Sequence, residues 1–108
     1  MSNLKIKELS VSNLDYDQQM LYLPFKPFKI LSITKERGEK LGMNVSINKK
    51  PFGISIDEIN NKTLNEYLNI GDKILFINNL QIADFTKSEI YQLIVCKTKL
   101  ILLVKTCN

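Results

Sequence analysis

Alternation of apolar and polar positions predicts strands over much of this chain. Ile54 and Ile56 share one face of the segment 53–59, and the residues between them are polar, which is typical of a half-buried strand. The segment 73–77 carries apolar residues on both faces, as expected of a central strand. Further strands are predicted at 28–34, 43–47, 80–82 and 100–106.

A long helix is predicted near the end of the chain from the residues that would cap it. Thr86 and Glu89 have the spacing of a capping box, in which each side chain accepts a hydrogen bond from a free backbone N–H at the helix start. Phe85 and Ile90 have the spacing of a hydrophobic staple. The helix is therefore expected to run to about Cys96.

A shorter helix and a tight turn are predicted on either side of the central strand. Thr63 and Glu66 repeat the capping-box spacing, so a helix is expected from there through Leu68. Asn78 and Asn79 are expected to form a tight turn, because asparagine tolerates left-handed backbone angles.

The first part of the chain has a weaker pattern. Apolar residues between 4 and 11 suit short strands, residues 15–19 are expected to form a loop, and Pro24 and Pro27 interrupt any regular element. We therefore expect residues 1–24 to be a leader outside the main fold, either disordered, adding a strand or packing on its surface. Residues 25–108 are expected to form one domain.

Composition narrows the class of protein. The chain has 108 residues, a net charge of +4 and no histidine, and its basic residues are scattered. This mild charge favours acidic partners or weak contact with an anionic membrane over nucleic acid. We expect a reduced Cys96 and Cys107, a cytoplasmic location that includes the membrane cortex, and no metal or other cofactor. No arrangement of residues indicates catalysis, so no enzyme is expected.

The segment 40–45 combines a glycine with large apolar neighbours. Gly42 allows backbone angles that other residues avoid, and successive N–H groups in such a turn can hold an anion. Leu41 and Met43 would form an apolar wall beside it. These features suit a free carboxylate followed by an apolar side chain, which is the end of another protein chain. The alternative is a glycine that only opens a strand.

Two motifs in this order make the chain resemble a PDZ domain over residues 28–106. Lys40-Leu41-Gly42-Met43 is similar to the family loop Gly-Leu-Gly-Phe. The run from Leu68 to Asn79 is similar to the family pattern Leu-x-x-Gly-Asp-x-Ile-Leu-x-Val-Asn-Gly. The resemblance implies a mainly β (α+β) fold, a partly open barrel or sandwich of roughly five to six strands with two helices.

The resemblance also implies a function and a site. PDZ domains are a known example of peptide binding by β-strand addition, so the chain is expected to bind C-terminal tails of cytosolic or membrane proteins as a monomeric part of a scaffold or adaptor. The implied site has three parts. They are the carboxylate loop (Lys40, Leu41, Gly42, Met43), the hydrophobic pocket (Leu41, Met43, Val45, Ile94) and the strand-pairing edge (Asn44, Val45, Ser46, Ile47).

Several positions depart from the family pattern or add to it. Lys40 replaces the first loop glycine, and either strains the loop, brings an ammonium near the ligand or points to water. Lys35 and Arg37 are candidates for additional positive charge. Lys87 is expected to select Asp, Glu, Ser or Thr at the third residue from the ligand's end, unless it points to water. Tyr91 is expected to narrow the groove, the alternative being an ordinary core position.

Two rival functions stay open at this point. A phosphoinositide-binding surface would gather Lys35, Arg37, Lys40, Lys49 and Lys50 around the groove. An assembly element would have its groove filled by the leader or by another domain.

Overall fold

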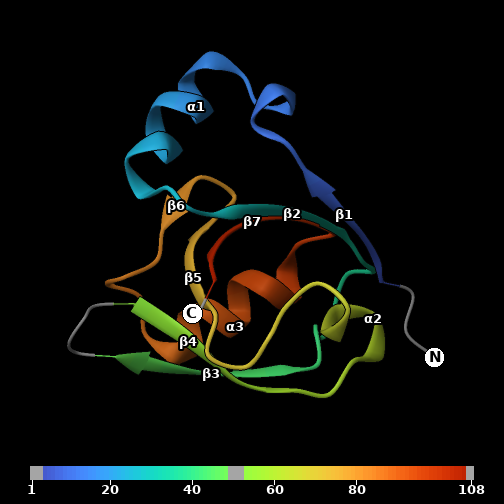
Figure 1. The fold of residues 1–108 in the computed structure, drawn as a ribbon. Coiled ribbons are helices and arrows are strands. Elements are labelled where there is room, and N and C mark those ends of the chain that lie inside the picture. The colour runs from blue at the N-terminus through green and yellow to red at the C-terminus, as the bar shows by residue number, and fades with distance from the viewer. Residues whose placement is uncertain (1–3, 49–52, 107–108) are drawn as a thin grey trace.

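The computed structural model describes residues 4–48 and 53–106, which form one antiparallel sheet and three α-helices (Figure 1). The sequence Asn48-Lys49-Lys50-Pro51 predicts a turn, and most of it lies outside the described residues. The strands are β1 (Lys5–Leu9), β2 (Lys29–Thr34), β3 (Met43–Asn48), β4 (Gly53–Ile59), β5 (Lys73–Ile77), β6 (Leu80–Gln81) and β7 (Lys99–Lys105). The helices are α1 (Tyr16–Tyr22), α2 (Lys62–Asn65) and α3 (Lys87–Cys96), with 3-10 turns η1 (Val11–Asn13) and η2 (Leu23–Phe25).

The sheet curves around a central core without closing. Its strand order is β1-β2-β7-β5-β4-β3, with β6 paired to β5. In Figure 1, β2 and β7 cross above the core, β3 and β4 lie below it, and α3 lies between these two layers. The predicted α+β class with a partly open sheet is confirmed. The described part of the chain has seven strands and three α-helices, more than expected, because the N-terminal segment adds β1 and α1.

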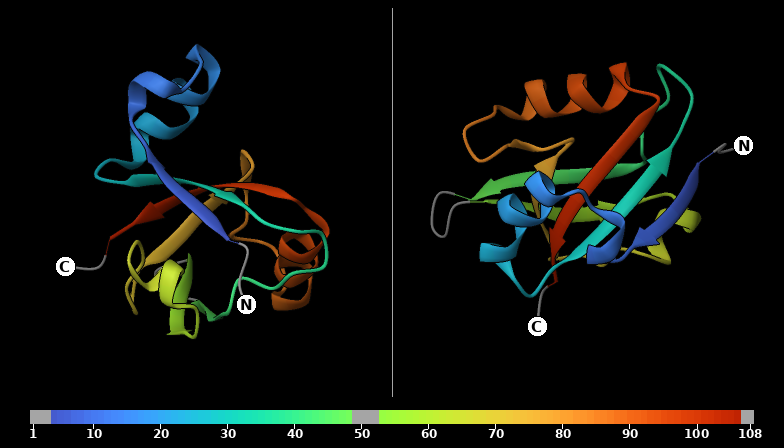
Figure 2. Two further views of the ribbon diagram at one scale, coloured as in Figure 1. Left: turned by 90° about the vertical axis from the view of Figure 1, so that its right-hand side faces the viewer. Right: turned by 90° about the horizontal axis from the view of Figure 1, so that it is seen from above.

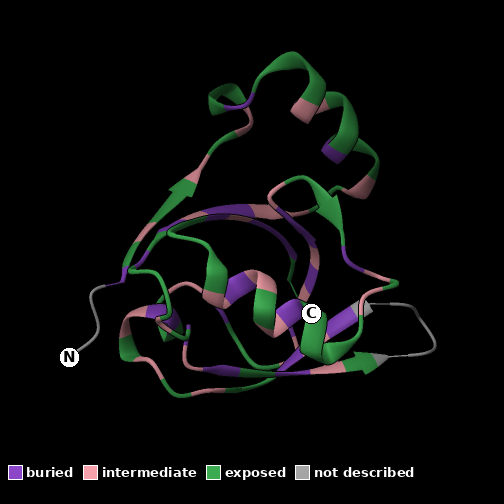
Figure 3. Cartoon of the chain, turned by 180° about the vertical axis from the view of Figure 1, so that it is seen from behind, coloured by how far each residue is buried: buried purple, intermediate pink, exposed green. Residues whose placement is uncertain are grey.

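The main core fills the space inside the curved sheet. Ile54 and Ile56 are fully buried and Asp57 is exposed, which confirms the alternation read for β4. On α3, Ile90 and Ile94 are buried, while the polar face is exposed, as the coloured ribbon shows (Figure 3). The burial of this apolar surface makes the main favourable contribution to holding the layers together.

The ends of α3 and β5 agree with their sequence signals. The Glu89 N–H donates to Thr86 Oγ1 at 3.1 Å, and the Thr86 N–H donates to Glu89 Oε1 at 3.0 Å. Hydrogen bonds to the Glu89 carboxyl from the Thr86 backbone N–H and, secondly, from the Thr86 side chain lower the pKa of that carboxyl. Asn78 and Asn79 have φ values of 50° and 68°, so the predicted tight turn after β5 is confirmed.

The predicted start of α2 was wrong. Asn61 is the N-cap, and its side chain accepts from the Leu64 N–H at 3.1 Å. Thr63 already lies inside the helix, which ends at Asn65 instead of Leu68. The physical reason is that an asparagine oxygen caps a helix start at least as well as a threonine hydroxyl, and Asn61 comes first in the chain.

The loop expected at 15–19 was also wrong, because most of it forms α1. Asp15 is the N-cap, and its carboxylate accepts from the Gln18 N–H at 2.8 Å. The Asp15 N–H donates to Gln18 Oε1 at 3.2 Å, which completes a capping box. The helix was missed because few of its residues are apolar at helical spacing, although the capping pattern is visible in the sequence.

The N-terminal segment covers the outer face of the sheet. β1 pairs with β2, and the helical part lies on the opposite side of β2 and β7 from α3 (Figure 2). A second apolar cluster joins Tyr22 and Leu14 to Ile30, Phe76 and Leu103 of the sheet. In the described part of the leader, β1 therefore extends the sheet and Leu4 joins the main core, whereas α1 packs on the sheet's outer face.

Tyr22 is the centre of this second cluster. Its ring is fully buried, and it lies 6.3 Å from the Phe28 ring and 5.2 Å from the Phe76 ring. Its hydroxyl donates to Asn79 Oδ1, which also accepts from Gln18 Nε2 at 3.4 Å. Burial raises the pKa of the Tyr22 phenol, and a hydrogen bond with the backbone of Asn79 opposes this shift in part.

Candidate functional site

The turn before β3 is built around Gly42. Its φ is +79°, a value that side-chain-bearing residues rarely adopt. Its carbonyl accepts from the Asn60 N–H at 2.6 Å, which ties the turn to the chain after β4. A Cβ at this position would lie 3.0 Å from the Asn61 Cβ, so the backbone approaches its neighbour closely. Both observations require glycine at position 42.

The hydrogen-bond pattern between β3 and β4 determines which backbone groups of β3 face away from β4. Residues of an antiparallel pair alternate between bonded and non-bonded positions. Gly42 bonds to Asn60, and Met43 lies opposite Ile59, so the N–H and C=O of Met43 point to the other edge. Val45 repeats this orientation, and its N–H donates to the Tyr91 hydroxyl on α3 at 3.1 Å. The groups of β3 that are not used by β4 therefore face α3.

A cavity of about 400 Å³ lies between the start of β3 and α3. Its size is within the range of ligand sites. Most of the walls are apolar, and the Leu41 and Met43 side chains are buried. The lining residues are Lys40, Leu41, Gly42, Met43, Asn44, Asn60, Tyr91, Ile94 and Val95.

The cavity brings together residues from separate parts of the sequence. Every member of the predicted carboxylate loop lines it, together with Ile94 of the predicted pocket, Asn44 of the predicted edge and Tyr91. Other candidates lie outside the lining. Val45 is fully buried, Ser46 is half-buried, and Ile47 and Lys87 are exposed.

Sequence reasoning missed two lining residues, Asn60 and Val95. Asn60 directly follows the well-marked strand β4, and its only sequence signal is that position. Val95 is the next residue after Ile94 on α3, and the apolar periodicity of the helix did not distinguish it from residues of the core. Both enter the site through long-range packing.

The positive charges near the cavity have different environments. Lys40 is exposed and is the one charged side chain among the described lining residues. Lys35 is buried, and its ammonium donates to the carbonyls of Glu36 at 2.9 Å and Val95 at 3.3 Å. Desolvation lowers the pKa of the Lys35 amine. Lys35 thus caps the end of α3, whereas Arg37 is exposed.

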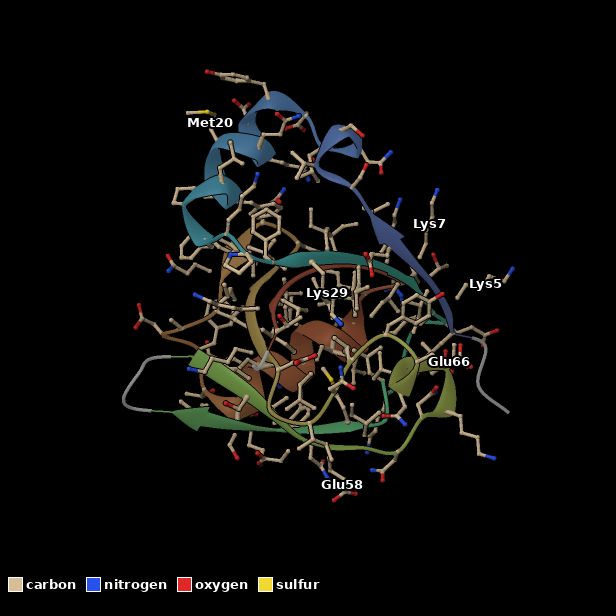
Figure 4. All side chains as sticks on the ribbon, in the orientation of Figure 1. Lys5, Lys7, Met20, Lys29, Glu58 and Glu66 are labelled. Atoms are coloured by element: carbon tan, nitrogen blue, oxygen red, sulfur yellow. The ribbon has the colours of Figure 1, made fainter. Side chains whose placement is uncertain are left out.

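Other polar groups outside the cavity serve the fold. Asp72 is buried, accepts from the Asn69 N–H at 2.9 Å and lies 3.8 Å from the Lys29 ammonium. Lys29 also donates to the Tyr67 carbonyl, and Figure 4 shows its side chain beneath β2. These contacts close the turn before β5.

Two further observations concern the surface. Cys96 is exposed and has no disulfide among the described residues, while Cys107 lies outside them, as do Lys49 and Lys50. None of the described helices combines the length and apolar character needed to cross a membrane.

Comparison with known proteins identifies the family. No curated protein matches the chain. The family model for the PDZ domain matches residues 31–105, from β2 to the end of β7. PDZ domains are generally non-catalytic modules that bind peptides of partner proteins. The match spans well over half of the 108 residues, and both the Gly42 turn and the groove-forming elements β3 and α3 lie inside it. The chain belongs to the PDZ domain family.

Proposed function

We propose that this domain binds the C-terminal tails of partner proteins by adding them as a strand to β3. The observation that carries the proposal is the cavity at the Gly42 turn, which opens beside an edge of β3 that β4 does not use. A tail needs an anion site for its carboxylate, an apolar pocket for its last side chain and backbone partners for its strand. The cavity and the neighbouring edge offer all three.

The carboxylate would bind at the turn before β3. Consecutive N–H groups of Leu41, Gly42 and Met43 can converge on an anion when the central residue has a positive φ. The exposed ammonium of Lys40 lies at the same cavity and would add attraction. The last side chain would contact Leu41, Met43 and Ile94. An apolar terminal residue such as valine or leucine would fit these walls.

With this mode of binding, the domain would act as part of a scaffold or adaptor in the cytoplasm. Such domains hold partners together with modest affinity, on the order of micromolar, or about −8 kcal/mol. In the described leader, β1 lies at the far edge of the sheet from β3 and α1 packs on the outer face, and none of the described residues 4–24 lines the cavity. A self-filled groove, the alternative of an assembly element, therefore has no support from residues 4–24.

The test compares one peptide with two different ends. A labelled five-residue peptide ending in valine is titrated as the free acid and as the amide, and fluorescence anisotropy gives both affinities. We expect the acid to bind at least about tenfold more tightly, because hydrogen bonds to a charged group contribute about 1.5–3 kcal/mol. Equal affinities for the two peptides would contradict the proposal.

Lys87 is proposed to set a preference at the third residue from the peptide's end. It is the first residue of α3 and is exposed. We expect Lys87→Leu to weaken binding of a peptide with Glu at that position by about threefold, because exposed ion pairs contribute about 0.2–1 kcal/mol. A peptide with Leu there should bind equally well to both proteins.

The matched control is Lys97→Leu. Lys97 is also exposed, but it follows the other end of α3. Its replacement removes the same net charge and should leave the ratio of affinities for the Glu and Leu peptides unchanged. If Lys87→Leu and Lys97→Leu give the same ratio as the original protein, Lys87 does not select the ligand.

A further inference from the structure

The Tyr91 hydroxyl accepts a hydrogen bond from a backbone N–H of β3 that an added strand would need as a donor. The Val45 N–H donates to this hydroxyl at 3.1 Å, across 46 positions of sequence. Val45 lies in the middle of β3, and its N–H points away from β4. A backbone N–H on a strand edge is normally satisfied by another strand or by water. Here a side chain from α3 takes that place.

This contact divides the groove into two parts. The cavity extends from the Gly42 turn to Tyr91 and is open, whereas Val45 is fully buried beyond it. We infer that Tyr91 is a gate: the terminal residue of a tail enters a preformed cavity, and the rest of the strand pairs with β3 only after the Tyr91 hydroxyl releases Val45. The inference rests on the proposed function, since it concerns how the same site admits its ligand.

Strand geometry identifies the ligand residue that meets the gate. A tail with its carboxylate at the Gly42 turn runs antiparallel to β3, with its last residue beside Met43. Residues of paired strands advance together at about 3.3 Å each, so the third residue from the end lies beside Val45. The carbonyl of that third residue is therefore the group that competes with the Tyr91 hydroxyl for the Val45 N–H.

Removal of the Tyr91 hydroxyl is expected to raise the affinity for a peptide. In the free protein the Val45 N–H already has a partner, so binding exchanges one hydrogen bond for another and gains little from it. Without the hydroxyl, the Val45 N–H of the free protein has only water as a partner, and the ligand carbonyl adds a hydrogen bond. One such bond has a net contribution that corresponds to a change in affinity of about two- to twelvefold.

The experiment uses Tyr91→Phe, which removes the hydroxyl and keeps the ring. Two probes are titrated into the whole chain: a five-residue acid peptide ending in valine, and N-acetylvaline, which stops one residue short of Val45. We expect Tyr91→Phe to bind the five-residue peptide about fivefold more tightly and to bind N-acetylvaline with less than a twofold change. The control Tyr67→Phe removes a hydroxyl from a half-buried tyrosine outside the lining and should change neither affinity.

A second measurement follows the contact without any ligand. Hydrogen exchange of the Val45 amide, measured by NMR in the free protein, should be faster in Tyr91→Phe than in the original chain and unchanged in Tyr67→Phe. Bound peptide should slow this exchange in all three proteins.

The outcomes separate this inference from the proposed function. An unchanged or weaker affinity of Tyr91→Phe for the five-residue peptide, or an unaltered exchange rate at Val45, overturns the gate even where acid peptides bind. Equal affinity of acid and amide peptides for the original chain overturns the proposed function instead. A tighter five-residue complex with faster Val45 exchange supports the gate.

Discussion

Gly42→Ala is expected to weaken binding of an acid peptide by about thirtyfold. Alanine at a φ of +79° costs about 1–2 kcal/mol, because its Cβ approaches the neighbouring carbonyl oxygen. That Cβ would also lie 3.0 Å from the Asn61 Cβ, so either the turn or the start of α2 must move. The free variant is expected to relieve this strain by relaxing the turn, so a bound carboxylate has to restore the strained turn. A cost of about 2 kcal/mol on binding corresponds to roughly thirtyfold in affinity.

The glycine at position 38 is a close control for this variant. Gly38 has a φ of +86°, so alanine there meets the same conformational cost, but its Cβ would have nothing within 4 Å. Gly38→Ala should therefore reduce stability by about 1 kcal/mol and leave peptide affinity unchanged. Isothermal titration gives the affinities and urea unfolding gives the stabilities.

The comparison isolates the role of the turn. If Gly42→Ala binds acid peptides as well as Gly38→Ala does, the amides at the turn do not receive the carboxylate. Loss of binding in both variants at equal stability would instead indicate that the whole loop from β2 to β3 matters. The expected result is loss of binding in Gly42→Ala alone.

The parts of the fold that could be predicted are those whose signals are local. The alternation of β4 and the capping box of α3 depend on residues within a few positions of one another, and both are confirmed. The same holds for the turn at Asn78, where two asparagines have positive φ. Local signals of this kind do not depend on how the sheet curves.

The errors occurred where two local signals competed or where one was weak. Both Asn61 and Thr63 can cap a helix, and the structure uses the first. The helix α1 has a capping box at Asp15, but only Tyr22 of its residues is buried, so apolar periodicity could not reveal it. The burial of Tyr22 depends on the sheet face beneath it, which the sequence of α1 does not contain.

In the candidate site too, the features with local sequence signals were predicted and those that depend on tertiary packing were not. The Gly42 turn was identified from adjacent residues and from its similarity to a family motif. Asn60 and Val95 line the cavity because β4 and α3 meet there, and the bond from Val45 to Tyr91 joins distant segments. Lys35 was a candidate for additional positive charge near the ligand, but packing buries it against the end of α3. Contacts of this kind depend on tertiary distances.

Tyr22→Ala is expected to destabilise the whole domain by about 3–5 kcal/mol. Removal of a large buried aromatic ring costs about this much, because apolar contacts are lost and a cavity remains. The Tyr22 ring is fully buried against Phe28 and Phe76, and its hydroxyl bonds to Asn79. Domains of this size have a free energy of unfolding of about 5–15 kcal/mol, so the loss is a large fraction.

The control is Tyr16→Ala on the same helix. The Tyr16 side chain is 73% exposed, so its removal should change stability by less than about 0.5 kcal/mol. Met20, which Figure 4 shows on the outer side of α1, is also exposed and offers a second control. Urea unfolding followed by circular dichroism, which reports on the sheet, gives the three free energies of unfolding.

This prediction decides whether residues 4–24 are a separate leader or part of the domain. If the N-terminal segment is only attached to the surface, Tyr22→Ala will release α1 and leave the unfolding of the sheet unchanged. We expect the sheet itself to unfold at lower urea, because the outer cluster that contains Tyr22 includes Ile30 and Leu103 of its strands. Peptide affinity of the folded variant should stay the same, since the groove lies on the other side of the sheet from α1. Tyr22→Ala would then lose stability without losing binding, which separates the energetics of the fold from those of the site.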